Sequence, residues 1–267
     1  MYMLLWGLGA SALVAGVGYR KGSLSESGFV GALLVGTLVM GFGGPLWFCM
    51  LLTFFISGSA LSHYKRERKG EVEANFAKTG RRDFGQALAN GGLGSLLAVL
   101  SRTLLSPGAA FAMFLGVMAT VSADTWATEI GVLSKQKPRS VLTWQEVPPG
   151  TSGGVSLLGT GAAALGALLV GLVAQIGLMF SGAPGLPGDK ILLAALVGGL
   201  AGCFTDSLLG ASCQLIFRCS TCGAETEKRE HCGRETEYLR GCRWLNNDMV
   251  NLLASGVGGL VAFIYLA

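Results

Sequence analysis

Two aspartates stand inside otherwise apolar segments of the chain. Asp124 lies in Val-Ser-Ala-Asp-Thr-Trp-Ala-Thr-Glu-Ile-Gly and Asp206 in Cys-Phe-Thr-Asp-Ser-Leu-Leu-Gly-Ala-Ser, so hydroxyl residues frame each and the segments form a weak internal repeat. An ionisable side chain inside a membrane helix is costly and by default indicates a functional site. Two carboxylates at matched depth could share one divalent cation, and Mg²⁺ favours one or two carboxylates together with phosphate oxygens and water. The alternative is that the acids pair with Arg or Lys and only hold helices together, but the apolar segments have no basic residue in their interiors.

Further polar residues accompany these acids. Glu129, five residues after Asp124, would project about 140° away on a helix of 3.6 residues per turn, so it is a catalytic candidate that need not join the same site. Polar stripes begin two other apolar segments, and spacings of three, four, seven or eight residues put each stripe on one helix face. The stripes are Asp83, Gln86 and Asn90, and Asn247, Asn251 and Ser255, with Asp248 beside the second.

The stripes and the acids could therefore line one cavity. The alternative is that the amides cap helices and bridge neighbours, which suits Asn247 because Asn is a common N-cap residue. Asn90 and Asn251 lie deeper in their segments, and we take both, with Asp248, as catalytic candidates.

Two loops combine basic residues with glycine, as phosphate-binding segments do. The first ends in Gly-Arg-Arg-Asp with Arg81 and Arg82, a pair suited to bidentate phosphate binding, although the position of the loop relative to a membrane explains its charge equally well. The second carries Lys135 and Arg139 and then runs through a glycine-rich stretch directly before an apolar segment, where backbone N–H groups at a helix start suit a phosphate. It has no Walker A ending. The glycine-rich stretch is Gly150, Thr151, Ser152, Gly153 and Gly154.

The segment 218–246 holds most of the cysteines and reads as a small cytoplasmic insertion. Cys219 and Cys222 form a Cys-x2-Cys pair, which His231-Cys232 and then Cys242 follow. The three cysteines 219, 222 and 232, with either His231 or Cys242, would satisfy a closed, tetrahedral, structural zinc site. Such a site would staple the loop and take no part in catalysis. Free thiols are the alternative, since disulfides are disfavoured in the cytoplasm.

The composition indicates which elements hold these residues. Of 267 residues, 51% are hydrophobic and 13% are charged, and the mean hydropathy is +0.55. A soluble domain has about 25% charged residues, so an ordinary soluble enzyme is excluded. Apolar runs that match a hydrocarbon core predict an all-α polytopic membrane protein, a single domain over 1–267 with about eight transmembrane helices. The runs are 1–18, 29–42, 46–61, 84–105, 109–133, 155–180, 191–217 and 249–267, of which 29–42 and 46–61 could instead form one re-entrant hairpin.

The basic residues predict the orientation of these helices. All except Arg102 and Lys190 fall on one set of alternating connections. The positive-inside rule puts those connections in the cytoplasm. We therefore expect both termini outside, an integral protein of the cell membrane, and an active site that faces the cytoplasm. The first apolar run has no basic residues before it, so we read it as a retained helix rather than as a signal peptide.

Five motifs together resemble a known family, the transmembrane protein 19 family, which includes the phytyl-phosphate kinases of tocopherol and phylloquinone synthesis. The likeness covers about residues 20–265. A fainter likeness joins Asp-Thr-Trp-Ala at Asp124, Gly131 and the loop 134–154 to CTP-using lipid enzymes, namely CDP-diacylglycerol synthase and dolichol or phytol kinase. The five motifs are Gly-Arg-Arg-Asp with Gln-Ala-Leu-Ala-Asn-Gly-Gly (80–92), Ser-Ala-Asp-Thr-Trp-Ala-Thr-Glu-Ile-Gly (122–131), Pro-Gly-Thr-Ser-Gly-Gly-Val-Ser (149–156), Thr-Asp-Ser-Leu-Leu-Gly-Ala (205–211) and Trp-Leu-Asn-Asn-Asp-Met-Val-Asn (244–251).

The resemblance implies a phosphotransferase that moves a phosphoryl group from a nucleoside triphosphate, with CTP favoured, to a prenyl monophosphate such as phytyl or geranylgeranyl phosphate. Asp124 and Asp206 would then hold Mg²⁺, and the glycine-rich stretch would supply backbone N–H groups. The phosphates would be neutralised by Arg81, Arg82, Lys135 and Arg139, and phosphate or metal-bound water would be oriented by Asn90, Asn247, Asp248 and Asn251. The expected partners are the prenyl lipid, the nucleotide and the bilayer, and not nucleic acid.

Two other functions compete with this one. Paired acidic helices with a weak repeat could carry a cation or proton, which makes a coupled transporter the main alternative. A zinc-loop scaffold that docks a partner through 218–246 is the third reading, and it leaves Asp124 and Asp206 unexplained. Gly-rich helices could pack between chains as well as within one chain, so the sequence does not decide between a monomer and a homo-oligomer.

Overall fold

The computed structural model describes residues 2–65, 67, 80–181 and 186–267, and over these ranges the chain forms eight α-helices. Seven helices, one of them α2 extended by the π-helical turn η1 (Val39–Gly43), are long and apolar enough to cross a membrane; α5, with 17 residues, is shorter. The helices are α1 (Tyr2–Arg20), α2 (Glu26–Leu38), α3 (Pro45–His63), α5 (Phe84–Leu100), α6 (Pro107–Gly131), α7 (Leu157–Ser181), α8 (Ile191–Ser212) and α9 (Asn247–Leu266).

The predicted all-α membrane fold is confirmed, with corrections at helix ends. The runs 29–42 and 46–61 form two separate helices, α2 with η1 and then α3, rather than one short hairpin. The run 84–105 is helical only to Leu100, and turns follow it. The run 191–217 is helical only to Ser212, and Ile216 and Phe217 belong to a strand.

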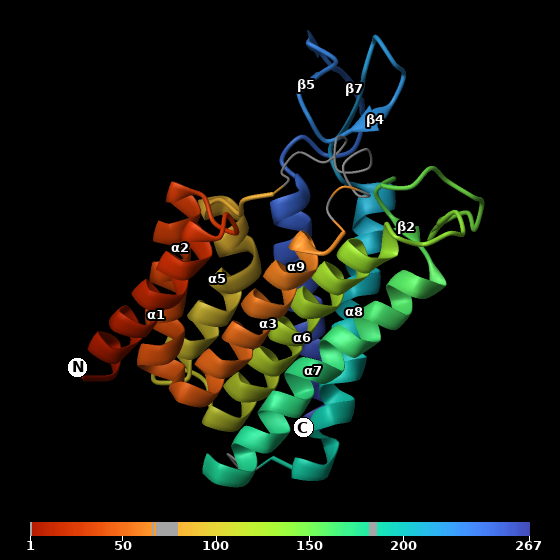
Figure 1. Cartoon of the computed structure of the whole chain (residues 1–267). Helices are drawn as coiled ribbons and strands as arrows, with labels where there is room; N and C mark the ends of the chain where they lie inside the picture. Colours follow the sequence, from red (N-terminus) through yellow and green to blue (C-terminus); the bar gives the residue numbers. More distant parts are fainter. Residues whose placement is uncertain (1, 66, 68–79, 182–185) are drawn as a thin grey trace.

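Both termini lie at one end of the helical bundle, and the Cys-rich strands project from the other (Figure 1). Arg102 follows α5 and donates to the carbonyl of Phe42 at 2.7 Å, and Lys190 ends the short 3₁₀ turn η2 (Gly188–Lys190) that leads into α8. These two basic residues therefore lie at the end of the bundle that holds the termini. Residues 66 and 68–79 of the basic loop 62–83 lie outside the described residues, and with them the basic residues at 66, 68, 69 and 78.

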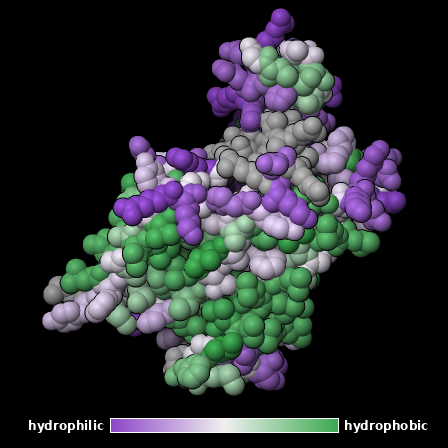
Figure 2. Space-filling view, viewed as in Figure 1, coloured by the Kyte–Doolittle hydropathy of each residue, from purple (hydrophilic) through white to green (hydrophobic). Residues whose placement is uncertain are grey.

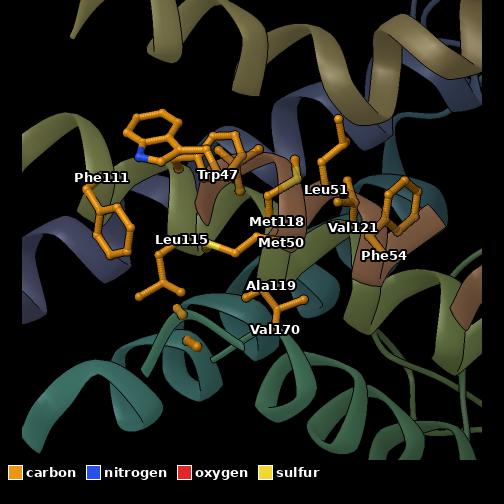
Figure 3. Close-up of a cluster of buried hydrophobic side chains, with 14 of the residues drawn as sticks. Trp47, Met50, Leu51, Phe54, Phe111, Leu115, Met118, Ala119, Val121 and Val170 are labelled. Atoms are coloured by element: carbon orange, nitrogen blue, oxygen red, sulfur yellow. The ribbon is translucent and has the colours of Figure 1, made fainter. Parts of the chain in front are cut away.

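Helix α6 runs through the middle of the bundle. Most of its side chains from Ala110 to Ala123 are buried, which marks it as the central helix. Large side chains from α3 pack on it, and Trp47 lies with its ring 4.3 Å from that of Phe114. Figure 3 shows this core, where residues of α3 and α6 meet Val170 of α7.

Glycines bring α6, α8 and α9 into close contact. A Cβ atom on Gly198 of α8 would lie 2.8 Å from the carbonyl oxygen of Gly258 of α9, and one on Gly116 of α6 would overlap the same carbonyl. Thr120 also donates to Gly116 at 2.9 Å and to Gly198 at 3.3 Å. Small residues at helix crossings are the usual means of packing helices in lipid. These three helices carry the acids described below.

Short strands form the connections at the end opposite the termini. The strand β1 (Arg139–Ser140) pairs with β2 (Gly154–Val155) between α6 and α7. The Cys-rich segment contains a three-stranded sheet in the order β4-β3-β7 and a hairpin of β5 and β6. Their bounds are β3 (Ile216–Arg218), β4 (Glu225–Thr226), β5 (Glu230–His231), β6 (Arg234–Glu235) and β7 (Glu237–Arg240). Hydrophilic residues gather on these strands and the neighbouring loops, while hydrophobic residues cover the helices (Figure 2).

Candidate active site

A polar cavity of about 380 Å³ opens at the end of the bundle beneath the Cys-rich strands. Its walls come from α3, α5, α6, α7, α8 and α9, together with the neighbouring loops. Most of the residues that the sequence singled out meet there, including Glu129, which was not required to join the aspartates. The predicted residues that line it are Arg82, Gln86, Asn90, Asp124, Glu129, Gly150, Thr151, Ser152, Gly153, Gly154, Asp206, Asn247, Asp248 and Asn251.

The glycine contacts explain why the two aspartates face one space. Asp124 lies eight residues after Gly116, and Asp206 lies eight residues after Gly198, so each acid is a little over two turns beyond its helix crossing. Three of the four hydroxyls that frame them bond to helix backbone instead: Ser122 donates to Gly166, and Thr205 and Ser207 donate to carbonyls one turn earlier. The Oδ2 atom of Asp206 is buried with no hydrogen-bond partner among the described residues. A carboxylate oxygen in that state fits a cation ligand.

Arg82 supplies positive charge at the cavity wall. Its guanidinium donates to the hydroxyl of Ser59 at 3.1 Å and lies over the rings of Phe54 and Phe55, with centroids at 5.3 and 5.7 Å. Removal of the guanidinium from water lowers the pKa of Arg82, and the Glu129 carboxylate opposes that shift. Arg82 is therefore a fixed, partly desolvated cation, and this environment strengthens its attraction for a phosphate.

Three of the predicted phosphate-binding cations are exposed and do not line the cavity, namely Arg81, Lys135 and Arg139. For Arg139, which lies in β1, the reason is strand geometry, because successive side chains of a strand point to opposite faces. The residue before Arg139, Pro138, lines the cavity. Arg82, which forms a bridge with Leu24, lines the cavity, whereas the side chain of Arg81 lies beside Gly22.

The polar stripes both cap helices and line the cavity. Asp83 is the N-cap of α5, where it accepts from the Gln86 N–H at 2.8 Å, and the Gln86 side chain accepts from the Asp83 N–H at 3.1 Å. At α9 the N-cap is Asn246, which accepts from Met249, and not Asn247 as the residue type suggested. Asn247 is therefore released from capping and lines the cavity.

The glycine-rich stretch borders the cavity but does not run directly into a helix. Strand β2 and Ser156 intervene, and the Ser156 hydroxyl accepts from the Gly159 N–H at 3.1 Å. Gly153 has φ +81°, and a Cβ atom there would overlap Ala211 of α8. The expected helix-start site is thus corrected to a glycine loop that is pressed against α8, with the start of α7 behind it.

The Cys-rich segment gathers four of its five predicted ligands. Cys219, Cys222, His231 and Cys232 have ligand atoms within 4.8 Å of one another, and Cys242 is outside this group. The hydrogen bond from the Cys222 backbone is the main cause that lowers the pKa of the Cys219 thiol to about 6. Two further residues of this region, Gln214 and Glu227, reach the cavity wall, although no sequence motif singled them out.

An apolar pocket adjoins the polar cavity. Three residues, Arg82, Gln86 and Asn90, line both. The remaining walls are almost wholly apolar and come from α1, α2, α3, α5 and the connection between α1 and α2, with Val14, Leu24, Val35, Phe48, Leu51 and Phe55 among them. A polar, charged cavity and an apolar pocket therefore meet at Arg82, Gln86 and Asn90, of which Arg82 carries the charge.

The fold and this site define a polytopic helical membrane protein with one acid-lined cavity at the end of its bundle. Residues 9–259 match the model of the integral membrane protein family DUF92, and the chain belongs to that family. The family resemblance inferred from the five motifs is thereby confirmed.

Similar proteins come from a plant and an archaeon. "Protein PGR" of Arabidopsis thaliana is 30% identical, over 95% of this chain and 92% of its own length. "Uncharacterized membrane protein MJ0933" of Methanocaldococcus jannaschii is 31% identical, over 90% and 85%. "Protein VTE6, chloroplastic" of Arabidopsis thaliana is 28% identical, over 98% of this chain and 69% of the relative. No solved structure matches the chain.

Proposed function

We propose that this protein is a membrane prenyl-phosphate kinase, which transfers a phosphoryl group from a nucleoside triphosphate to a prenyl monophosphate. The observation that carries the proposal is the junction of the acid-lined cavity with the apolar pocket at Arg82, Gln86 and Asn90. A lipid with a single phosphate needs such a junction, because its two ends require opposite surroundings. The similarity to VTE6 supports a function of this kind.

The apolar pocket suits the part of the prenyl chain next to the phosphate. It holds about 60 Å³, so the rest of a long tail would lie in the bilayer against the outer helices. Arg82 would bind the acceptor phosphate, and its guanidinium is held for this by Ser59 and the two phenylalanine rings. A fixed planar cation fits phosphate oxygens in a bidentate manner.

The polar cavity suits the donor triphosphate and Mg²⁺. The donor set is made of hard oxygen ligands, and Oδ2 of Asp206 has no hydrogen-bond partner among the described residues. Asp124 and Asp206 would therefore hold the ion, with Asp248 in the same cavity wall. When bound, Mg²⁺ neutralises charge on the phosphates. The glycine stretch 150–154 would approach the donor phosphates through its backbone, with CTP the favoured nucleotide.

The residues present suit this chemistry without a strong base. Phosphoryl transfer depends mainly on positioning and charge neutralisation. An acceptor phosphate is already nucleophilic, so proton removal contributes little. Neither histidine is an acid–base partner of the aspartates: His63 lines the cavity rim but bonds to the carbonyls of Ser59 and Lys21, and His231 lies in the Cys-rich group. With the positive-inside rule, the cavity would open to the cytoplasm at the cell membrane.

The test is a phosphoryl-transfer assay on the purified protein in detergent, with phytyl or geranylgeranyl monophosphate, Mg²⁺ and each of CTP, ATP, GTP and UTP. We expect a diphosphate product from the wild type and from Asp189→Asn, an exposed acid at the opposite end of the bundle. We expect none from Asp124→Asn or Asp206→Asn. If folded wild-type protein gives no product with any pair, the kinase proposal fails.

A further inference from the structure

The four ligand atoms of the Cys-rich segment already have the spacing of a metal site. Nδ1 of His231 lies 3.5 Å from Sγ of Cys222 and 3.3 Å from Sγ of Cys232. Zinc bonds of about 2.3 Å to sulfur and about 2.0–2.1 Å to nitrogen, at tetrahedral angles, put such atoms about 3.6 Å apart. All four atoms, Sγ of Cys219 included, lie within 4.8 Å of one another.

The backbone of both ligand pairs is shaped for this arrangement. Cys219 and Cys222 lie on a tight turn, in which the Gly223 N–H donates to the Cys219 carbonyl at 2.9 Å and Gly223 has φ +74°. The second pair lies on a hairpin, since His231 pairs with Arg234 and leaves a two-residue loop.

That loop, Cys232-Gly233, has φ +52° and +72°, the left-handed pattern of a type I′ turn. Asn, Asp or Gly is the usual first residue of such a turn, and a cysteine there is strained. The turn itself does not favour a cysteine at position 232, whereas metal ligation would explain why a cysteine stands there.

We propose that Cys219, Cys222, His231 and Cys232 bind one structural Zn²⁺, and that this ion holds Glu227 at the wall of the polar cavity. Three thiolates and one imidazole in a closed tetrahedron are the ligand set of structural zinc. The structure selects His231 over Cys242 as the fourth ligand. The proposal concerns the fold of this segment, and it stands independently of the reaction.

The link to the cavity runs through the strand between the two ligand pairs. Glu227 directly follows β4, between Cys222 and His231, and its Oε1 accepts from Nε2 of Gln214 at 2.7 Å. Gln214 is 2% exposed and lines the same cavity. Glu227 contributes negative charge near Asp206. An ion bound by Cys222 before Glu227 and by His231 after it would therefore fix the position of one acid in the cavity wall.

The same segment is anchored on the helix that carries Asp206. The Arg240 guanidinium donates to the carbonyls of Gly210 and Ala211 at 3.1 and 2.9 Å, at the end of α8. It also lies 3.9 Å from the Glu225 carboxylate on β4. The sheet thus sits on α8, with Cys219 directly after β3 and His231 at the end of β5.

The first experiment measures metal in the full-length protein, purified in detergent from cells grown with added zinc. We expect about one zinc ion per chain in the wild type and in Cys242→Ser, the matched control, because that exposed cysteine lies outside the group. Cys222→Ser should lose the ion. Because that variant could misfold, cobalt(II) added to the metal-stripped wild type gives a second reading, and thiolate-to-cobalt charge-transfer absorption is expected.

The second experiment uses amide hydrogen exchange to test whether the ion fixes the segment that carries Glu227. Removal of zinc with a chelator should speed exchange across residues 225–240 and leave α6 unchanged. A wild type that contains no zinc and gives no thiolate–cobalt absorption would overturn the metal site. Equal metal loss in Cys242→Ser would overturn the ligand assignment, and unchanged exchange at 225–240 would overturn the role assigned to the ion.

Discussion

Replacement of Gly198 by alanine tests whether the glycine contact among α6, α8 and α9 builds the site. The new Cβ would lie 2.8 Å from the Gly258 carbonyl oxygen and 3.0 Å from Cβ of Ala262. Ordinary contact begins at 3.4 Å, so α8 and α9 must separate by about 0.6 Å. The Gly258 carbonyl belongs to the backbone of α9, so it cannot rotate away from the new methyl group as a flexible side chain could. Overpacking of this kind costs about 1–3 kcal/mol.

A matched control isolates that cost. Gly161 in α7 has open space where a Cβ would be placed, so Gly161→Ala adds the same methyl group without a clash. Both variants gain about 0.5–1 kcal/mol of helix propensity, and this gain cancels in their difference. We therefore expect Gly198→Ala to be about 1–3 kcal/mol less stable than Gly161→Ala.

Thermal unfolding in detergent measures this difference. For a chain of this size each kcal/mol corresponds to about 2–4 °C in midpoint. Equal midpoints for the two variants would refute the packing argument. Because Asp206 lies eight residues beyond Gly198, the shift should also reach the cavity, where a displacement of about 1 Å can cost about 100-fold in rate. Wild-type turnover by Gly198→Ala would show that the crossing does not position the acid.

Three further predictions use the same unfolding assay. Saturating Mg²⁺ should stabilise the wild type by RT ln(1 + [L]/Kd), about 2.7 kcal/mol at 100 times Kd, and an equal response from Asp206→Asn would exclude that residue as a ligand. Asn246→Ala should cost about 1 kcal/mol because it removes the N-cap of α9, whereas Asn247→Ala should leave stability unchanged. Arg82→Lys should cost about 0.5–2 kcal/mol because an ammonium cannot reproduce the stacking on Phe54; an unchanged midpoint would contradict the contact.

The helices and the convergence of their acids could be predicted from the sequence. Hydropathy and the alternation of basic connections are strong signals in a membrane protein, because the bilayer fixes both helix length and direction. Asp124 and Asp206 occupy matched depths in helices of the same direction, so their meeting follows from that alternation. Glu129 joined them because its helix passes the cavity wall near Ser62 of α3, whose hydroxyl donates to it at 2.5 Å.

The cavity rim could not be predicted in the same way. Whether Arg139 or Pro138 faces the cavity depends on the register of β1 with β2, and a two-residue strand has no hydrophobic pattern to set it. Gln214 and Glu227 meet because the sheet β4-β3-β7 folds back on α8, a contact between residues 13 positions apart. Asn246 and Asn247 are identical in type, and only the geometry of the helix start decides which one caps.

The transporter alternative requires α6, α8 and α9 to move apart below the acids, and their close backbone contacts oppose that movement. On α6 the next turn from Asp124 toward the termini carries Thr120, which is 2% exposed and bonded to both Gly116 and Gly198. Beyond it Met118 and Phe114 are fully buried. Where α6, α8 and α9 cross, a single added Cβ would already overlap a backbone carbonyl, so the described residues leave no room there for a hydrated ion to pass. A cavity that is closed in this way and acidic at its floor suits a reaction with reactants that enter and leave from one side.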